Sequence, residues 1–82
     1  MLIRIYSKPD CSHCQAAKEY FQARGLAYKE FDVTGDARAR VEWLELSRRQ
    51  VVPVIVIDRK VFVGFEANKP WIEQMLSPEE AK

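Results

Sequence analysis

At residues 6–14 the sequence reads Tyr6-Ser7-Lys8-Pro9-Asp10-Cys11-Ser12-His13-Cys14, and both cysteines of the chain lie in this stretch. An apolar run precedes the Cys-x-x-Cys and a helix-forming run follows it, which predicts a strand-to-helix junction. The first turn of a helix offers free backbone N–H groups and the positive end of the helix dipole, and both stabilise a thiolate. The thiolate is the nucleophile of thiol chemistry, so this placement indicates a reactive Cys11. Cys14, one turn later, could then attack a mixed disulfide on Cys11.

The size and charge of the chain limit its class of function. Its 82 residues, 48% of them apolar, suffice for one core, so we predict one domain over residues 1–76 and a polar tail over residues 77–82. Thirteen Lys and Arg against twelve Asp and Glu give a net charge of +1, which does not favour a nucleic-acid partner. No apolar run approaches the roughly 20 residues of a transmembrane helix, and no signal peptide is recognised. We expect a cytoplasmic monomer without a membrane partner.

The hydrophobic pattern predicts an α/β fold with the element order β-α-β-α-β-β-α. The predicted strands cover residues 2–6, 26–33, 51–57 and 61–63, and the predicted helices cover residues 12–24, 37–49 and 69–76. Gly25 marks the end of the first helix, and Asp36 and Asn68 are expected to cap the other two. The first strand–helix–strand unit requires parallel strands, and the short connection at residues 58–60 predicts an antiparallel hairpin. We therefore expect a four-stranded mixed sheet with three helices.

Helical spacing also predicts which side chains face the core. The expected inner faces are Cys14, Ala17 and Phe21 in the first helix, Ala37, Val41 and Leu44 in the second, and Trp71, Ile72, Met75 and Leu76 in the third. Trp43 and Trp71 are expected at the edges of their helix faces, where an aromatic ring can pack against a core.

The arrangement of these elements resembles the glutaredoxins and their small glutaredoxin-like relatives, within the thioredoxin superfamily. The resemblance covers residues 2–76 and has two anchors, the Cys-x-x-Cys after a strand and Val52-Pro53 before a buried strand. The approach Lys8-Pro9-x-Cys11 is also similar to that of glutaredoxins. The resemblance implies a thioredoxin fold and a redox-active disulfide that serves electron transport and cell redox homeostasis. In that role Cys11 is the catalytic nucleophile and Cys14 the resolving cysteine.

The resemblance implies that two further residues tune the Cys11 thiolate. Lys8 matches a glutaredoxin lysine that lies near the thiolate and near a carboxylate of glutathione. His13 stands where protein disulfide isomerase also has a histidine, and in its protonated form it would stabilise the thiolate. Asp10 acts in the opposite direction, because a neighbouring carboxylate disfavours ionisation of a thiol.

Together with Lys8, four further residues are expected to form a substrate or glutathione site. The resemblance implies a cis peptide bond before Pro53, and a backbone at Val52 that pairs with an extended substrate. Gly64 and Phe65 stand where glutaredoxins carry Gly-Gly and then acidic residues that hold glutathione, and the Gly-Phe pair is similar to NrdH-type redoxins. Glutathione is therefore expected only as a co-substrate, with no bound cofactor and no metal. We also expect Tyr6 and Phe65 to give the site an apolar rim.

The residues leave several functions open. The first is a glutaredoxin-like thiol–disulfide oxidoreductase that acts on protein or mixed disulfides and is reduced by glutathione or by thioredoxin reductase. A second is an NrdH-type electron donor to ribonucleotide reductase, reduced by thioredoxin reductase. A third is a metal or iron–sulfur module formed by dimerisation, since two cysteines and one histidine are too few for a zinc site in one chain. An adaptor domain without turnover is the fourth. A structural disulfide is disfavoured, because a two-residue spacer closes too small a loop to stabilise the fold much.

Overall fold

The computed structural model describes residues 1–76, and the predicted polar tail at residues 77–82 lies outside the described residues. The elements are β1 (Ile3–Ser7), α1 (Ser12–Ala23), β2 (Lys29–Asp32), α2 (Ala37–Ser47), β3 (Val54–Ile57), β4 (Lys60–Val63), the 3₁₀ turn η1 (Glu66–Asn68) and α3 (Lys69–Leu76). Their order confirms the predicted β-α-β-α-β-β-α pattern. None of the helices in this part of the chain is long and apolar enough to cross a membrane.

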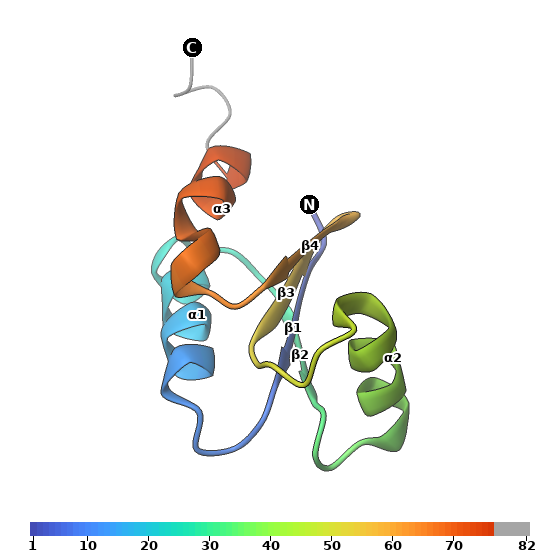
Figure 1. Ribbon diagram of the computed structural model, residues 1–82. Coiled ribbons are helices and arrows are strands. Elements are labelled where there is room, and N and C mark those ends of the chain that lie inside the picture. Colours follow the sequence, from blue (N-terminus) through green and yellow to red (C-terminus); the bar gives the residue numbers. More distant parts are fainter. Residues whose placement is uncertain (77–82) are drawn as a thin grey trace.

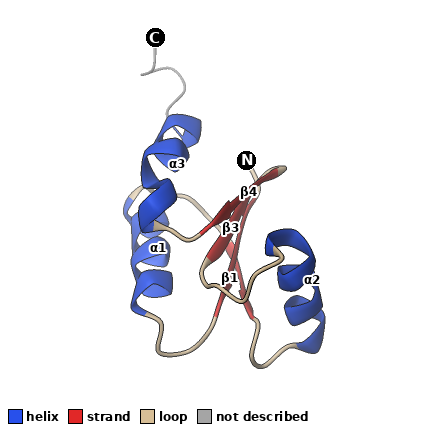
Figure 2. Cartoon of the chain, viewed as in Figure 1, coloured by secondary structure: helices blue, strands red, loops and turns tan. Residues whose placement is uncertain are grey.

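The four strands of the described residues form one mixed sheet in the order β2-β1-β3-β4. β1 pairs with β2 in parallel and with β3 in antiparallel orientation, and β3 and β4 form the predicted hairpin. The sheet lies between two helical layers, with α1 and α3 on one face and α2 on the other (Figures 1 and 2). The mixed sheet and its three helices confirm the expected fold class.

Strand residues alternate between two apolar clusters, because successive side chains of a strand point to opposite faces of the sheet. One cluster packs with α1 and α3 and contains Ile3, Ile5, Ala17, Phe21, Ile55, Ile57, Phe65 and Ile72. The other packs with α2 and contains Tyr6, Val33, Trp43, Val54 and Val56. This alternation fixes Ser7, the last residue of β1, on the α1 side, beside the start of the first helix.

The two predicted helix-end signals around α1 and α2 are confirmed. Gly25, in the left-handed region at φ 69°, donates its N–H to the carbonyl of Gln22, and Leu26 donates to that of Phe21. These are the two hydrogen bonds of a Schellman motif, which a glycine allows without steric cost. Asp36 accepts hydrogen bonds from two backbone N–H groups of the first turn of α2. Local signals thus place the ends of both helices.

The structure corrects the expected inner face of α2. Val41 is 56% exposed, whereas Trp43, expected at an edge, is 5% exposed and donates its indole N–H to the carbonyl of Val51 over 2.8 Å. Trp71 is 59% exposed and does not pack in the core. Strands β2 and β3 begin three residues later than predicted, at Lys29 and Val54.

The expected cap of the third helix is also wrong. Asn68 donates its side-chain amide to the carbonyls of Val63, over 2.8 Å, and Gly64, over 3.1 Å, so it holds the end of β4 instead of accepting from a helix N–H. The turn η1 precedes α3 here, and Asn68 is its last residue. Asn68 therefore ties the loop after β4 to the sheet.

Candidate functional site

The two cysteines lie at the N-terminus of α1 and are joined by a disulfide, with Cα atoms 5.2 Å apart. Cys11 is the N-cap residue, with extended backbone, and its sulfur accepts a hydrogen bond from the backbone N–H of Cys14 over 3.2 Å. Cys11 is partly exposed, whereas Cys14 is buried, at 1% exposure. In the reduced protein the same N–H group can stabilise a Cys11 thiolate, as a side-chain cap is stabilised at other helix N-termini.

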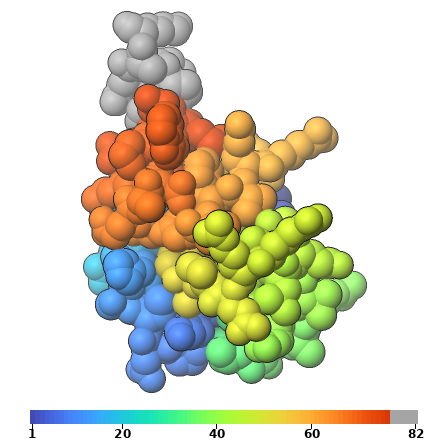
Figure 3. All heavy atoms as spheres, viewed as in Figure 1, coloured from blue at the N-terminus to red at the C-terminus, as the bar shows by residue number. Residues whose placement is uncertain are grey.

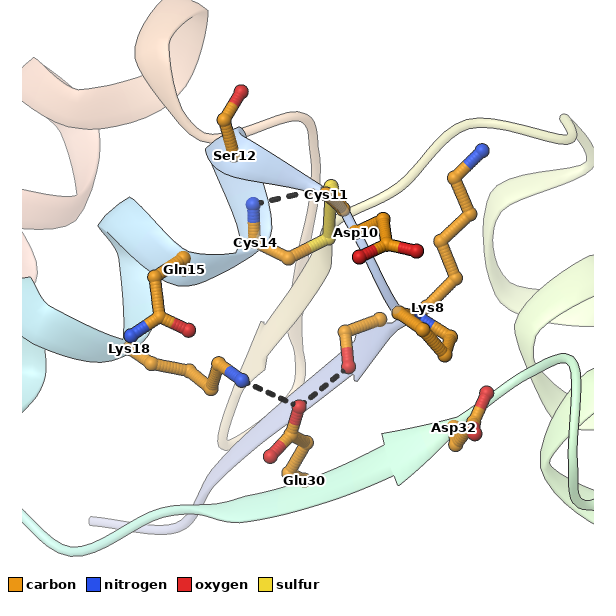
Figure 4. Close-up of a pocket in the computed structure, with 11 residues that line it drawn as sticks. Lys8, Asp10, Cys11, Ser12, Cys14, Gln15, Lys18, Glu30 and Asp32 are labelled. Carbon is orange, nitrogen blue, oxygen red and sulfur yellow. Dashed lines mark hydrogen bonds and ion pairs between the residues drawn. A yellow bond between two sulfur atoms is a disulfide. The ribbon is translucent and has the colours of Figure 1, made fainter.

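A pocket of about 620 Å³ opens beside the disulfide (Figure 4). It lies between the end of β1, the loop that leads to Cys11, the first two turns of α1, and β2. Its lining consists of Ser7, Lys8, Pro9, Asp10, Cys11, Ser12, Cys14, Gln15, Lys18, Glu30 and Asp32. Both sulfur-bearing residues therefore border a space that also holds several charged side chains.

An ion pair spans this pocket. The Lys18 ammonium of α1 lies 2.9 Å from Oε2 of Glu30 on β2, and the buried Ser7 hydroxyl donates to the same oxygen over 2.7 Å. The hydrogen bonds from Lys18 and Ser7 hold the pKa of Glu30 below its usual range, so the Glu30 carboxylate is charged at neutral pH. Sequence reasoning missed Lys18 and Glu30. A signal for Lys18 is its spacing from Cys14, since residues four apart lie on one helix face.

Asp32, the other β2 carboxylate of the pocket, forms its hydrogen bonds with the turn that follows β2. Its Oδ1 accepts from the Thr34 hydroxyl over 2.6 Å, from the Thr34 backbone N–H over 2.8 Å and from the Gly35 N–H over 3.2 Å. These bonds lower the pKa of Asp32, the hydroxyl contributing most. Asp32 therefore organises the turn that leads to α2.

The predicted tuning residues lie in different surroundings. Lys8 is exposed and lines the pocket, whereas His13 is exposed and does not. Lys8 can thus meet a bound group beside the disulfide, whereas the charge of His13 is screened by solvent. Among residues 1–76, no three His, Cys, Asp or Glu side chains are grouped so that they could hold a metal ion.

Of the five predicted substrate-binding residues, Lys8 lines the pocket, and the other four, Val52, Pro53, Gly64 and Phe65, lie outside its lining. The Val52–Pro53 peptide bond is cis, Val52 is half-buried, and the Pro53 carbonyl accepts from the Gly64 N–H over 2.8 Å. This bond joins the turn before β3 to the end of β4. On the face seen in Figure 3, the segment before β3 reaches the surface between the start of α1 and α2. The roles of these residues toward a substrate stay predictions.

The expected apolar rim is wrong. Tyr6 is fully buried, stacks on Phe31 with ring centroids 5.1 Å apart, and donates its hydroxyl to Glu42 on the α2 side of the sheet. Phe65 is 3% exposed and packs edge-on against Tyr20 in the other cluster. Both rings are core residues, and neither forms a rim beside the disulfide.

The family model for glutaredoxin matches residues 3–62. The chain belongs to the glutaredoxin family. A glutaredoxin-like protein of the rubredoxin operon of Clostridium pasteurianum is 37% identical to this chain over 75 residues, which are 92% of this chain and 97% of the relative. A solved structure of a mutant thioredoxin-like protein has a TM-score of 0.80 and 39% identity, covering 90% of this chain and 97% of the other. The solved structure of the glutaredoxin-like NrdH-redoxin from Escherichia coli has a TM-score of 0.71 and 28% identity, covering 84% of this chain and 90% of the other.

One prediction concerns the effect of His13 on the reduction potential of the cysteine pair. An imidazolium near a thiolate stabilises the reduced form and makes the protein more oxidising. Because His13 is exposed, solvent screens its charge, and we expect His13→Tyr to lower the reduction potential by less than about 30 mV, a factor below ten in the equilibrium constant. The potential itself should lie in or above the glutaredoxin range of about −200 to −230 mV.

Equilibration of wild type and variant with a glutathione redox buffer measures this difference. It should vanish at alkaline pH, where an imidazole is neutral. A potential near the thioredoxin value of about −270 mV that the substitution does not move would assign the thiolate's stability to the helix N-terminus alone.

Proposed function

We propose that this member of the glutaredoxin family is a cytoplasmic thiol–disulfide oxidoreductase that reduces protein or mixed disulfides with both cysteines. The observation that carries the proposal is the position of Cys11, partly exposed at the first turn of α1, with its sulfur bonded to the N–H of a buried Cys14. This arrangement gives one accessible nucleophile and one protected thiol, which a two-step exchange requires.

The chemistry proceeds in two balanced exchanges. The Cys11 thiolate attacks one sulfur of the substrate disulfide, and the other sulfur leaves as a thiolate. Cys14 then loses its proton and attacks the Cys11 sulfur, which forms the internal disulfide and releases the second substrate thiolate. The substrate gains two electrons and the protein loses two. In this proposal the backbone at Val52 and Gly64 aligns the substrate, and Lys8 attracts a carboxylate of glutathione.

A second candidate is an NrdH-type electron donor that is reduced by thioredoxin reductase. Its support is Phe65, which is buried against Tyr20 and offers no polar side chain to glutathione after Gly64. The similar NrdH-redoxin from Escherichia coli is described as a glutaredoxin-like protein with a thioredoxin-like activity profile. Both candidates use the same cysteine chemistry and differ in the source of electrons.

The test is to supply the oxidised protein with two reducing systems in parallel, glutathione with glutathione reductase, and thioredoxin reductase, each with NADPH. We expect NADPH consumption coupled to reduction of insulin or of a glutathione mixed disulfide in at least one system. Faster reduction by thioredoxin reductase supports the second candidate, and faster reduction by glutathione supports the first.

Protein that has first been reduced chemically and freed of reductant serves as the control, because its activity does not depend on the reductase chosen. If this protein also transfers no electrons to insulin or to the mixed disulfide, the oxidoreductase proposal is wrong and an adaptor role takes its place.

A further inference from the structure

The backbone N–H groups at the N-terminus of α1 do not explain how Cys14 is deprotonated in the resolving step. Cys14 must lose a proton before it can attack, yet it is 1% exposed. The N–H of Cys14 points to the Cys11 sulfur, and the N–H of Gln15 is bonded to the Cys11 carbonyl. The backbone donors near the start of the helix therefore serve Cys11. The acidity of Cys14 must be set by other groups, and the pocket is where Cys14 meets them.

Lys18 is the charged residue of α1 that lines the pocket together with Cys14. The two residues are four apart on α1, so their Cβ atoms lie about 5–6 Å from each other on one helix face. Both line the pocket, and in Figure 4 the Lys18 side chain extends across it to Glu30. The ion pair, 2.9 Å long, is only partly exposed, with 21% of the Lys18 and 41% of the Glu30 side chain accessible.

We propose, resting on the dithiol mechanism above, that Lys18 and Glu30 act on the acidity of Cys14 in opposite directions, so that the balance between the two charges sets the rate at which the mixed disulfide is resolved. The Lys18 cation favours the Cys14 thiolate, and the Glu30 anion opposes it. With both present the two effects largely offset each other, so Cys14 remains a protonated thiol until a mixed disulfide forms. The proton then leaves to water in the pocket, and the Cys14 thiolate attacks the Cys11 sulfur. Loss of either charge alone changes how readily this thiolate forms.

The other charged groups around Cys14 are less suited to this role. Lys8 and Asp10 carry opposite charges on the exposed loop, and the carboxylate of Asp32 is held by Thr34 and Gly35. His13 does not line the pocket. On α3, the other element packed against α1, the ammonium of Lys69 lies over the Tyr20 and Phe65 rings, and Glu73 acts on Tyr20, two turns beyond Cys14.

The experiment measures the pKa of Cys14 in a Cys11→Ser background from the pH dependence of its alkylation by iodoacetamide. Lys18→Gln leaves an unbalanced anion and should raise this pKa, whereas Glu30→Gln leaves an unbalanced cation and should lower it, each by up to about one unit. The double variant Lys18→Gln/Glu30→Gln should return to within about 0.3 units of the parent. Lys29→Gln and Glu45→Gln remove the same charges at exposed positions outside the pocket and should change nothing.

An electrostatic role requires that the two single variants shift the pKa of Cys14 in opposite directions and that the shifts cancel in the double variant. Loss of structure would shift both single variants in the same direction and would add in the double variant, so that result, or no shift at all, overturns the proposal. Circular dichroism shows that each variant is folded. Because alkylation needs no disulfide substrate, the measurement stands even if the protein fails to reduce insulin. With both cysteines present, single-turnover release of a thiol from the mixed disulfide should then change in the same order as the pKa values.

Discussion

Cys11→Ser is expected to abolish disulfide reduction completely, the largest effect of any substitution in this chain. The hydroxyl of serine is not ionised near neutral pH, so the first attack has no nucleophile, and the buried Cys14 cannot replace it. The Cys11 thiol should titrate below the ~8.5 of a free cysteine, because a helix N–H is directed at its sulfur. Insulin reduction and the pH dependence of alkylation measure the two effects.

Cys14→Ser is the matched variant, with the same chemical change three residues away. It should retain the first attack and lose the second, so that a mixed disulfide with the substrate accumulates and is seen by mass spectrometry or on a non-reducing gel. The assignment of roles is reversed if, in the reduced wild type, Cys14 is alkylated faster than Cys11 near neutral pH.

Much of the fold was predictable because its signals are local. The strand-to-helix junction at Cys11, the glycine after the first helix and the acidic cap at Asp36 each depend on a few neighbouring residues, and each lies where it was expected. The order of elements then restricts the sheet, since a short strand–helix–strand unit imposes a parallel pair and a short connection imposes a hairpin.

The inner face of α2 was not predictable in the same way. Its sequence offers two stripes, one through Val41 and one through Ala39 and Trp43, with charged residues between both. Spacing alone does not choose between them. The choice depends on the connection to β3, where the carbonyl of Val51 provides a partner for the indole N–H of Trp43. That contact joins residues eight apart and exists only when the helix has packed on the sheet.

The side chains around the disulfide also depend on the assembled fold and could not be predicted from spacing alone. Tyr6 precedes the cysteine loop and was expected beside it, but the alternation of β1 turns its ring to the α2 side, and Ser7 faces the pocket instead. Glu30 reaches the pocket because β2 lies parallel to β1, with Glu30 beside Ile5. This register is a property of the assembled sheet. The cysteines could thus be found from the sequence, whereas the ion pair beside them could not.

Trp43→Ala is the second substitution for which we expect a large effect, a loss of about 3–5 kcal/mol in the free energy of unfolding. The indole is 5% exposed and fills the cluster between α2 and the sheet, so its removal leaves a cavity. A domain of this size has roughly 4–12 kcal/mol in total, and the variant should therefore be partly unfolded near 37 °C. Urea denaturation followed by circular dichroism measures the loss.

The other tryptophan of the chain provides the control, because Trp71→Ala makes the same change at a side chain that is 59% exposed and should cost no more than about 0.5 kcal/mol. Trp43→Phe keeps a smaller aromatic ring in the cluster but removes the bond to Val51, so an intermediate loss of about 1–2 kcal/mol is expected. Val51 lies next to the Val52–Pro53 turn, so Trp43→Phe should also slow substrate reduction while the alkylation of Cys11 stays unchanged. If Trp43→Ala and Trp71→Ala lost the same free energy of unfolding, the packing of α2 described above would be contradicted, because only a buried indole leaves a cavity behind.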